Sequence, residues 1–204
     1  MMNIADFNRV IIYFVGLSFI FGCGSFPKRT VPAHYLNKNN INALNGKYTI
    51  KAIYSGPTKD TTSAWNFSDS DLGIYPTFFD ELNNGLFVKS IKKDSTKIYT
   101  FSLKILSTKK LEFNYFEDDS IIKQNTIKYR FKDDGYVYLK HKNFKIIGIP
   151  YVFGGFDTKR NRITINKDTN LLFETSEFKS GGLFLLMINP YTKMKYEKIY
   201  QRIE

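Results

Sequence analysis

The stretch that decides the fold is Gly46-Lys47-Tyr48-Thr49-Ile50-Lys51-Ala52-Ile53-Tyr54. Every second side chain is apolar, and these positions are Tyr48, Ile50, Ala52 and Tyr54. The positions between them are mostly polar, namely Lys47, Thr49 and Lys51. Because successive side chains of a β-strand point to opposite faces, this period of two predicts a strand with one face buried and the other in water.

The same alternation recurs along the rest of the chain. It predicts further strands within residues 99–105, 111–115, 127–131, 136–139, 144–149, 163–165, 171–173 and 183–188. Turn residues separate them, including Asp133-Asp134-Gly135, Gly154-Gly155 and Ser180-Gly181-Gly182. No helical pattern of ten residues alternates with the strands, so a parallel α/β sheet is not expected.

About eight to ten short strands with short connections predict an all-β fold, an antiparallel meander. Such a sheet either closes into a barrel or folds over into a sandwich. The C-terminal segment after Pro190 fits two patterns: a helix with Tyr196, Ile199 and Tyr200 on one face, or a last strand, which we favour slightly.

One long connection interrupts the meander between Ser55 and Gly85. Within it, the spacing of Phe78, Phe79 and Leu82 predicts a short helix that ends at Asn83-Asn84-Gly85. Long connections in compact domains are usually functional or disordered, and the large apolar side chains of this one argue against disorder. We therefore expect a lid or a plug over one end of the sheet, with the only tryptophan, Trp65, on the segment that leads into it.

Leu44-Asn45-Gly46-Lys47-Tyr48 resembles the Gly-x-Trp motif with which lipocalins and their relatives open their first strand, with Tyr48 in place of Trp. The long first connection with a short helix, followed by hairpins, also resembles the lipocalin layout across most of residues 44–204. The resemblance implies a lipocalin-like barrel, in which a late arginine packs over the motif's aromatic ring. Arg202 is the candidate for that arginine. A different antiparallel barrel or a sandwich remains the alternative.

Aromatic residues make up 17% of the chain, and most are expected to form the core of the sheet. Those on inward faces could also line a cavity that holds one small ligand. The hypothetical ligand-binding set is Tyr48, Trp65, Phe78, Phe79, Phe101, Phe113 and Tyr129.

The N-terminus predicts where the protein is located. Arg9 precedes an apolar run from Val10 to Phe21, which is too short for a bilayer, since a spanning helix needs about 20 residues. The run ends in Ile20-Phe21-Gly22-Cys23, which resembles the lipobox of bacterial lipoproteins, whose cysteine is acylated after the signal peptide is removed. The alternative is a buried N-terminal helix with a free Cys23.

The expected organisation is a signal peptide at 1–22, a lipidated Cys23 with a flexible tether to residue 43, and a β-barrel domain at 44–204. Pro27, Pro32 and the run Asn37-Lys38-Asn39-Asn40 argue against a packed element in the tether. The resemblance to lipoproteins implies a bacterial cell-envelope protein held by its lipid, with the outer membrane and its periplasmic face as the expected location.

Catalytic and metal-binding patterns are scarce. The chain has one Cys and two His, so the residues do not suggest an internal disulfide, a His-rich metal site or a nucleophile beside a base. The fragment Asp69-Ser70-Asp71-Leu72-Gly73 has only the first part of a calcium loop. We therefore expect no enzyme, no catalytic residues, no metal and no cofactor.

The net charge of +11 comes from lysines spread over polar strand faces and turns. A solvated basic surface is the plainest interpretation, attraction to anionic lipid or polysaccharide is the next, and nucleic acid is not expected as a partner. Two function classes remain: a lipid-anchored protein that binds a small lipophilic or amphipathic ligand in a barrel cavity, and a structural or interaction lipoprotein with a solid core.

The lipidation of Cys23 can be tested by the Cys23→Ser variant. We expect the variant to be released from membranes, because the acyl chains that hold the protein would be missing. Fractionation of cells, followed by immunoblotting, measures this. A variant that stays with the membranes, in its uncleaved form, would show that Cys23 is not the anchor.

Overall fold

The computed structural model of the chain describes residues 26, 36–57, 77–83, 94–140, 144–149, 153–183 and 191–204; at 80, 83, 144–149, 153–156, 179–183 and 191–193 it describes the backbone alone. Within these ranges the fold is all-β, with a single ten-stranded sheet. The first half contains η1 (Ile41–Leu44, a 3₁₀ turn), β1 (Gly46–Thr49), β2 (Tyr54–Pro57), α3 (Phe78–Asn83), β3 (Tyr99–Ser107), β4 (Lys110–Glu117) and β5 (Ser120–Phe131). The second half contains β6 (Val137–Lys140), β7 (Phe144–Ile149), β8 (Phe153–Ile165), β9 (Leu171–Leu183) and β10 (Tyr191–Tyr200).

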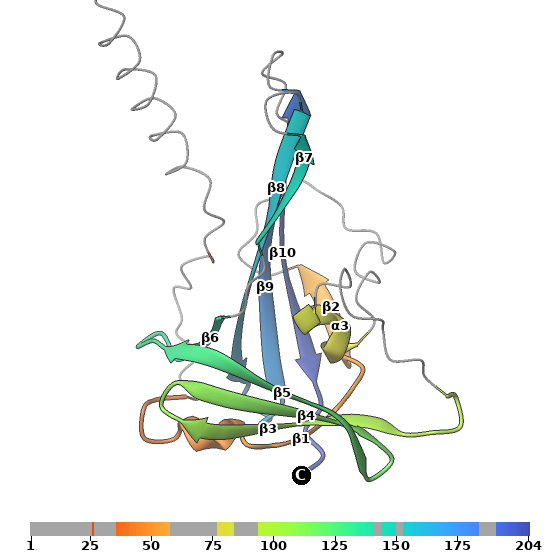
Figure 1. The fold of residues 1–204 in the computed structure, drawn as a ribbon. Helices are drawn as coiled ribbons and strands as arrows, with labels where there is room; N and C mark the ends of the chain where they lie inside the picture. The colour runs from red at the N-terminus through yellow and green to blue at the C-terminus, as the bar shows by residue number, and fades with distance from the viewer. Residues whose placement is uncertain are drawn as a thin grey trace, which may run out of the picture.

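The strands follow the order β1-β3-β4-β5-β6-β8-β9-β10-β2, and β7 pairs with β8. All pairs are antiparallel, so the predicted antiparallel meander is confirmed. β6 and β7 pair with successive parts of β8, and the two strands therefore lie end to end along it. Figure 1 shows the curled lower body of the sheet, from which β8 and β9 rise as a long ribbon with β7 beside them.

The two ends of the sheet meet at the first predicted strand. β1 pairs with β3 at one end of the strand order, and β2 pairs with β10 at the other. β1 also bonds to the C-terminal segment: the N–H of Lys47 donates to the carbonyl of Glu204 at 3.0 Å, and the N–H of Thr49 to that of Gln201 at 2.9 Å. The chain from Gly46 to Pro57 thus joins both ends, and the sheet curls into a barrel-like form (Figure 1).

The predicted single strand at 46–54 is therefore two short strands with a bend between them. The long connection, predicted to begin at Ser55, begins later, because Ser55–Pro57 belongs to β2. Most of the rest of that connection lies outside the described residues.

Arg202 holds the junction of the two ends together. Its guanidinium group donates to the carbonyl oxygens of Ala43 at 3.0 Å and of Asn45, and lies 5.9 Å from the centroid of the Tyr48 ring. This is the contact that the lipocalin resemblance implied for Arg202. Gly46 is required here, since a Cβ at that position would lie 2.6 Å from the carbonyl oxygen of Glu204. Burial raises the pKa of Tyr48 to about 12, so its hydroxyl stays protonated and donates to the carbonyl of Leu44 at 2.9 Å.

Helix α3 fills the space inside the curled sheet. The ring of Phe78 stacks on that of Phe101 with centroids 4.0 Å apart, and Phe79 meets Tyr115 edge to face at 4.9 Å. Further rings surround Phe78, at centroid distances of 5.1–5.5 Å: Phe113, Phe173 and Tyr200. Aromatic pairs of this kind add about 0.5–1.5 kcal/mol each to the free energy gained by burial. The helix lies where the spacing of Phe78, Phe79 and Leu82 placed one.

The sequence interpretation was wrong about two glycine pairs. Gly154 and Gly155 were predicted to form a turn, and so were Gly181 and Gly182, but all four lie inside β8 and β9. Gly154 pairs with Gly182, and Gly155 with Gly181, so the glycines face one another across the ladder. The last segment is a strand, β10, as we favoured.

A buried ionic cluster fixes α3 to the far side of the sheet. Glu81 of α3 accepts from Lys159 of β8 at 2.8 Å through Oε2, and its Oε1 lies 2.6 Å from Nζ of Lys198 on β10. The hydroxyl of Tyr196 also donates to Oε2 of Glu81 at 2.8 Å. The carboxylate and both ammonium groups are at most 5% exposed, so water screens the attraction between them very little.

Removing the charge of Glu81 should destabilise the protein strongly. The Glu81→Gln variant keeps the shape but removes the carboxylate that both buried ammonium groups contact, and breaking comparable buried pairs costs about 3–5 kcal/mol. Denaturant unfolding measures this cost. The control is Asp119→Asn, which removes a fully exposed carboxylate 3.6 Å from Lys47 and should leave the midpoint nearly unchanged. Equal midpoints for Glu81→Gln and the unchanged protein would contradict the assignment.

Candidate functional site

Four of the predicted ligand-binding residues come together in the core. Tyr48, Phe78, Phe101 and Phe113 are all fully buried and belong to one cluster of packed side chains. The centroids of the Tyr48 and Phe101 rings are 5.5 Å apart, and Phe101 in turn stacks on Phe78. In this structure the four rings fill the interior with one another.

The other predicted residues lie elsewhere. Phe79, the next residue of α3, packs against Tyr115, and the Lys123 ammonium lies 4.3 Å from the centroid of the Phe79 ring. Tyr129 of β5 lies at a surface hollow, described below. Trp65 and Cys23 lie outside the described residues, so their predicted roles remain predictions.

The hollow beside Tyr129 exists because β5 is longer than the hairpin that it follows. β5 pairs with β4 up to Lys128, and from Lys128 onward it pairs with β6. The β3–β4 turn ends at that point, where the N–H of Tyr129 donates to the carbonyl of Lys109 at 2.9 Å. The segment Lys38–Asn42 lies opposite, and the space between them has a volume of about 840 Å³.

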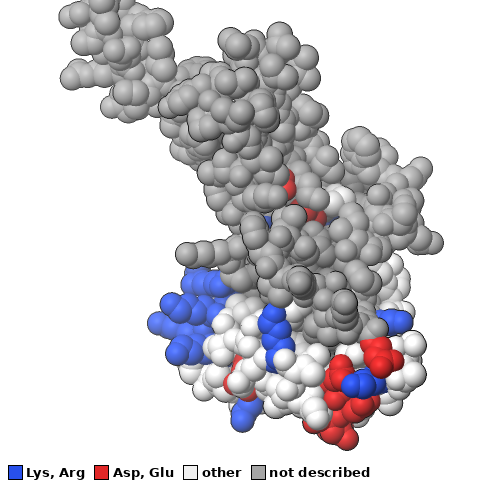
Figure 2. Space-filling model, turned by 45° about the vertical axis from the view of Figure 1, so that its right-hand side comes forward, with Lys and Arg blue, Asp and Glu red and all other residues white. Residues whose placement is uncertain are grey.

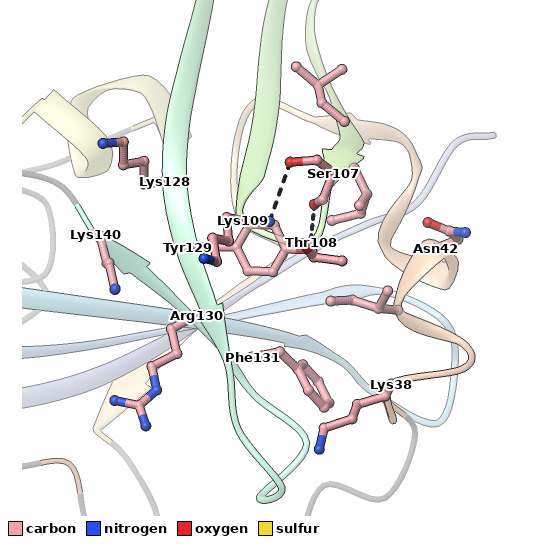
Figure 3. Close-up of a pocket in the computed structure, with 13 residues that line it drawn as sticks. Lys38, Asn42, Ser107, Thr108, Lys109, Lys128, Tyr129, Arg130, Phe131 and Lys140 are labelled. Atoms are coloured by element: carbon pink, nitrogen blue, oxygen red, sulfur yellow. Dashed lines mark hydrogen bonds between the residues drawn. The ribbon is translucent and has the colours of Figure 1, made fainter.

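We call this hollow the β5 groove. Its apolar lining residues are Ile41, Ile105, Leu106, Tyr129 and Phe131. Its basic lining residues are Lys38, Lys109, Lys128, Arg130 and Lys140, and the rest are Asn42, Ser107 and Thr108. In Figure 3, Lys128, Arg130 and Lys140 lie on one side of β5, with Tyr129, Phe131 and the β3–β4 turn on the other. The groove is therefore amphipathic.

Tyr129 anchors the floor of the groove. Its side chain is only 3% exposed, and its hydroxyl donates to the carbonyl of Ser107 at 2.9 Å (Figure 3). Burial raises the pKa of this hydroxyl, which therefore remains a neutral donor at physiological pH. The β3–β4 turn is thus tied to β5 through the side chain and the backbone of Tyr129.

The electrostatic character of the groove is one-sided. Among the described residues that line it, none is acidic and five are basic. Of these five basic residues, only Lys38 forms an ion pair within the described part of the chain. Its partner is Asp133, at 3.3 Å, and both side chains are largely exposed. On the face seen in Figure 2, Lys and Arg side chains gather on one side of the molecule and most Asp and Glu side chains on another.

Sequence reasoning did not find this groove. Tyr129 was selected as an inward-facing aromatic residue, and Lys109 and Lys140 were interpreted as parts of a solvated basic surface. The groove forms where β5 ends its pairing with β4 and begins its pairing with β6, at Lys128. The position of that change depends on strand lengths and register, which the local sequence pattern does not contain. The alternation in Ile127-Lys128-Tyr129-Arg130-Phe131 was the available signal: it places cations and aromatic rings on opposite faces of one strand.

Other kinds of site are not formed by the residues that the structure describes. Among them, no three His, Cys, Asp or Glu side chains come together as metal ligands. No helix in the described ranges has both the length and the apolar character needed to cross a membrane. No protein family, curated protein or solved structure matches the chain.

Proposed function

We propose that this chain is a lipid-anchored protein of the bacterial cell envelope that binds an amphipathic ligand in the β5 groove. The anchor is Cys23, proposed from the lipobox-like Ile20-Phe21-Gly22-Cys23. The single observation that supports the binding function is the groove itself, whose described lining residues combine apolar side chains with five cations and include no carboxylate. We propose no catalytic activity.

The size of the groove suits a small amphiphile. Its volume of about 840 Å³ falls within the range of about 300–1,000 Å³ that is usual for small-molecule sites. Ile105, Leu106 and Phe131 would contact the hydrocarbon chain of such a ligand. Each methylene group removed from water contributes about 0.8 kcal/mol, so a few buried methylenes supply useful affinity.

The groove replaces the barrel interior as the proposed site. A ligand between Tyr48, Phe101 and Phe113 would have to displace Phe78, which occupies the space between them in the described structure. Displacing a buried phenylalanine costs about as much as removing it, roughly 3–5 kcal/mol. The β5 groove requires no such rearrangement, which makes it the better candidate.

A second candidate function is an interaction lipoprotein with a solid core, and one observation favours it. Ile98, Ile121 and Ile122 are 70%, 58% and 40% exposed, and the N–H of Asp118, next to them in the β4–β5 turn, donates to the carbonyl of Ile98 at 2.7 Å. Exposed apolar residues gathered at one hairpin can form a protein contact. We rank this function second because the patch consists of only three exposed residues in the described part of the hairpin.

Photo-crosslinking tests the proposed binding site. The full chain in a neutral maltoside detergent is irradiated with a photoreactive laurate, with and without an excess of ordinary laurate. We expect saturable labelling, with the labelled peptides mapping to the β3–β4 turn and the second half of β5. Peptide mapping by mass spectrometry reads this directly.

Matched variants make the test specific. Leu106→Glu places a carboxylate in the groove and should abolish most of the labelling, because the carboxylate would repel the laurate and wet the apolar lining. Ile121→Glu makes the same change at an exposed residue outside the groove and should label normally. Labelling that is not saturable, or that is equal in the two variants, would overturn the proposal.

A further inference from the structure

Three lysines stand in a row across three neighbouring strands. Lys110 of β4 lies directly opposite Lys128 of β5, and Lys128 lies directly opposite Lys140 of β6. All three side chains are exposed. Directly opposite residues of an antiparallel pair have Cβ atoms about 4.5–5.5 Å apart, and like charges in such positions are destabilising. The lysine row, as we call it, therefore weakens the sheet that contains it.

The charge of the lysine row is not neutralised by its neighbours. None of Lys110, Lys128 and Lys140 forms an ion pair with a residue in the described ranges, and the same holds for Lys109 and Arg130. Arg130 follows Lys128 by two residues, so the alternation of the strand places it on the same face. Four cations thus share one surface of β4, β5 and β6.

The lysine row continues into the β5 groove. Lys128 and Lys140 line the groove together with Arg130, whereas Lys110 lies outside it, at the end of the row. An amphiphile with its chain against Ile105 and Phe131 would therefore bring its head group to the lysine row. An apolar site for the chain and a multiply charged site for the head group thus belong to one groove, on opposite sides of β5.

We propose that the β5 groove binds an amphiphile whose head group is a phosphate, and that Lys128, Lys140 and Arg130 hold that phosphate. This inference rests on the function proposed above and names its ligand class. A phosphate monoester carries about −1.5 to −2 charges at neutral pH and has three terminal oxygens, so it can accept from several cations at once. A carboxylate has one charge and two oxygens in one plane, and it would leave most of the row uncompensated. The guanidinium fork of Arg130 also matches phosphate in two-point contacts.

The test measures competition against the photoreactive laurate on the full chain in neutral maltoside. Lauroyl lysophosphatidic acid should displace the label at about one tenth of the concentration that laurate requires, because its charge-assisted contacts are more numerous. Both compounds have the same acyl chain, so the difference reports the head group. If both compounds displaced the label at the same concentration, the phosphate proposal would be overturned and the proposed function would stand. An absence of saturable labelling would overturn the proposed function itself.

The second part of the test substitutes two lysines of the lysine row. The double variant Lys128→Gln with Lys140→Gln should require about tenfold more lysophosphatidic acid, and only about twofold more laurate, for the same displacement. The control, Lys104→Gln with Lys167→Gln, removes the same charge from exposed lysines that do not line the groove and should behave like the unchanged chain. Equal effects of the two double variants would overturn the role of the row.

Two further measurements test whether the site binds free phosphate and whether Lys128 supports the fold. Inorganic phosphate at millimolar concentration should not displace the label, and displacement by it would show a site for free phosphate and overturn the amphiphile. Denaturant unfolding of the Lys128→Gln variant should show a midpoint at or above that of the unchanged chain, because a like-charge repulsion is relieved. A lower midpoint would show that Lys128 supports the fold, and would overturn its assignment to the ligand.

Discussion

The hydrogen bonds on both sides of the first strand are the constraint on which the rest of the structure depends. β1 bonds to β3 on one edge and to the C-terminal residues on the other, so the ends of the sheet cannot separate without breaking a ladder. Arg202 and Gly46 make this junction possible: the guanidinium group satisfies the carbonyls of Ala43 and Asn45, and the missing side chain of Gly46 lets the C-terminal backbone approach. The curl that results encloses the space that α3 fills, and it leaves fewer unpaired strand edges exposed to other chains.

The packed aromatic core is the reason why we propose a ligand site outside it. Phe78 and its neighbouring rings occupy one part of the core, and Glu81 of the same helix contributes a buried carboxylate that contacts Lys159 and Lys198. Such a core stabilises the fold, and a ligand placed among these rings would have to displace one of them. The binding surface that we propose lies where β4 ends and the longer strand β5 continues, paired with β6. Its amphipathic character follows from the alternation of that strand, whose cations and rings face opposite sides.

The sequence predicted the strands well and the turns between them less well. Alternation located most strands because one face of each is buried, and the spacing of Phe78, Phe79 and Leu82 located α3. Glycine misled the interpretation at Gly154 and Gly155, because a glycine pair is typical of turns and here lies in a ladder against other glycines. The lysine row and the pairing of Glu81 with Lys159 could not be predicted, because both depend on which distant residues the register brings together. Arg202 was found from the resemblance, not from its own local pattern.

Hydrogen exchange at the junction tests this account most directly. The amides of Lys47, Thr49 and Ile203 donate to carbonyls across the junction, at 2.8–3.0 Å. If the junction joins the ends of the sheet permanently, these amides should exchange only through global unfolding, as slowly as the amides in the middle of β4. Exchange through local opening, at the faster rates typical of an edge strand, would show that the sheet is open at this point and would contradict the account.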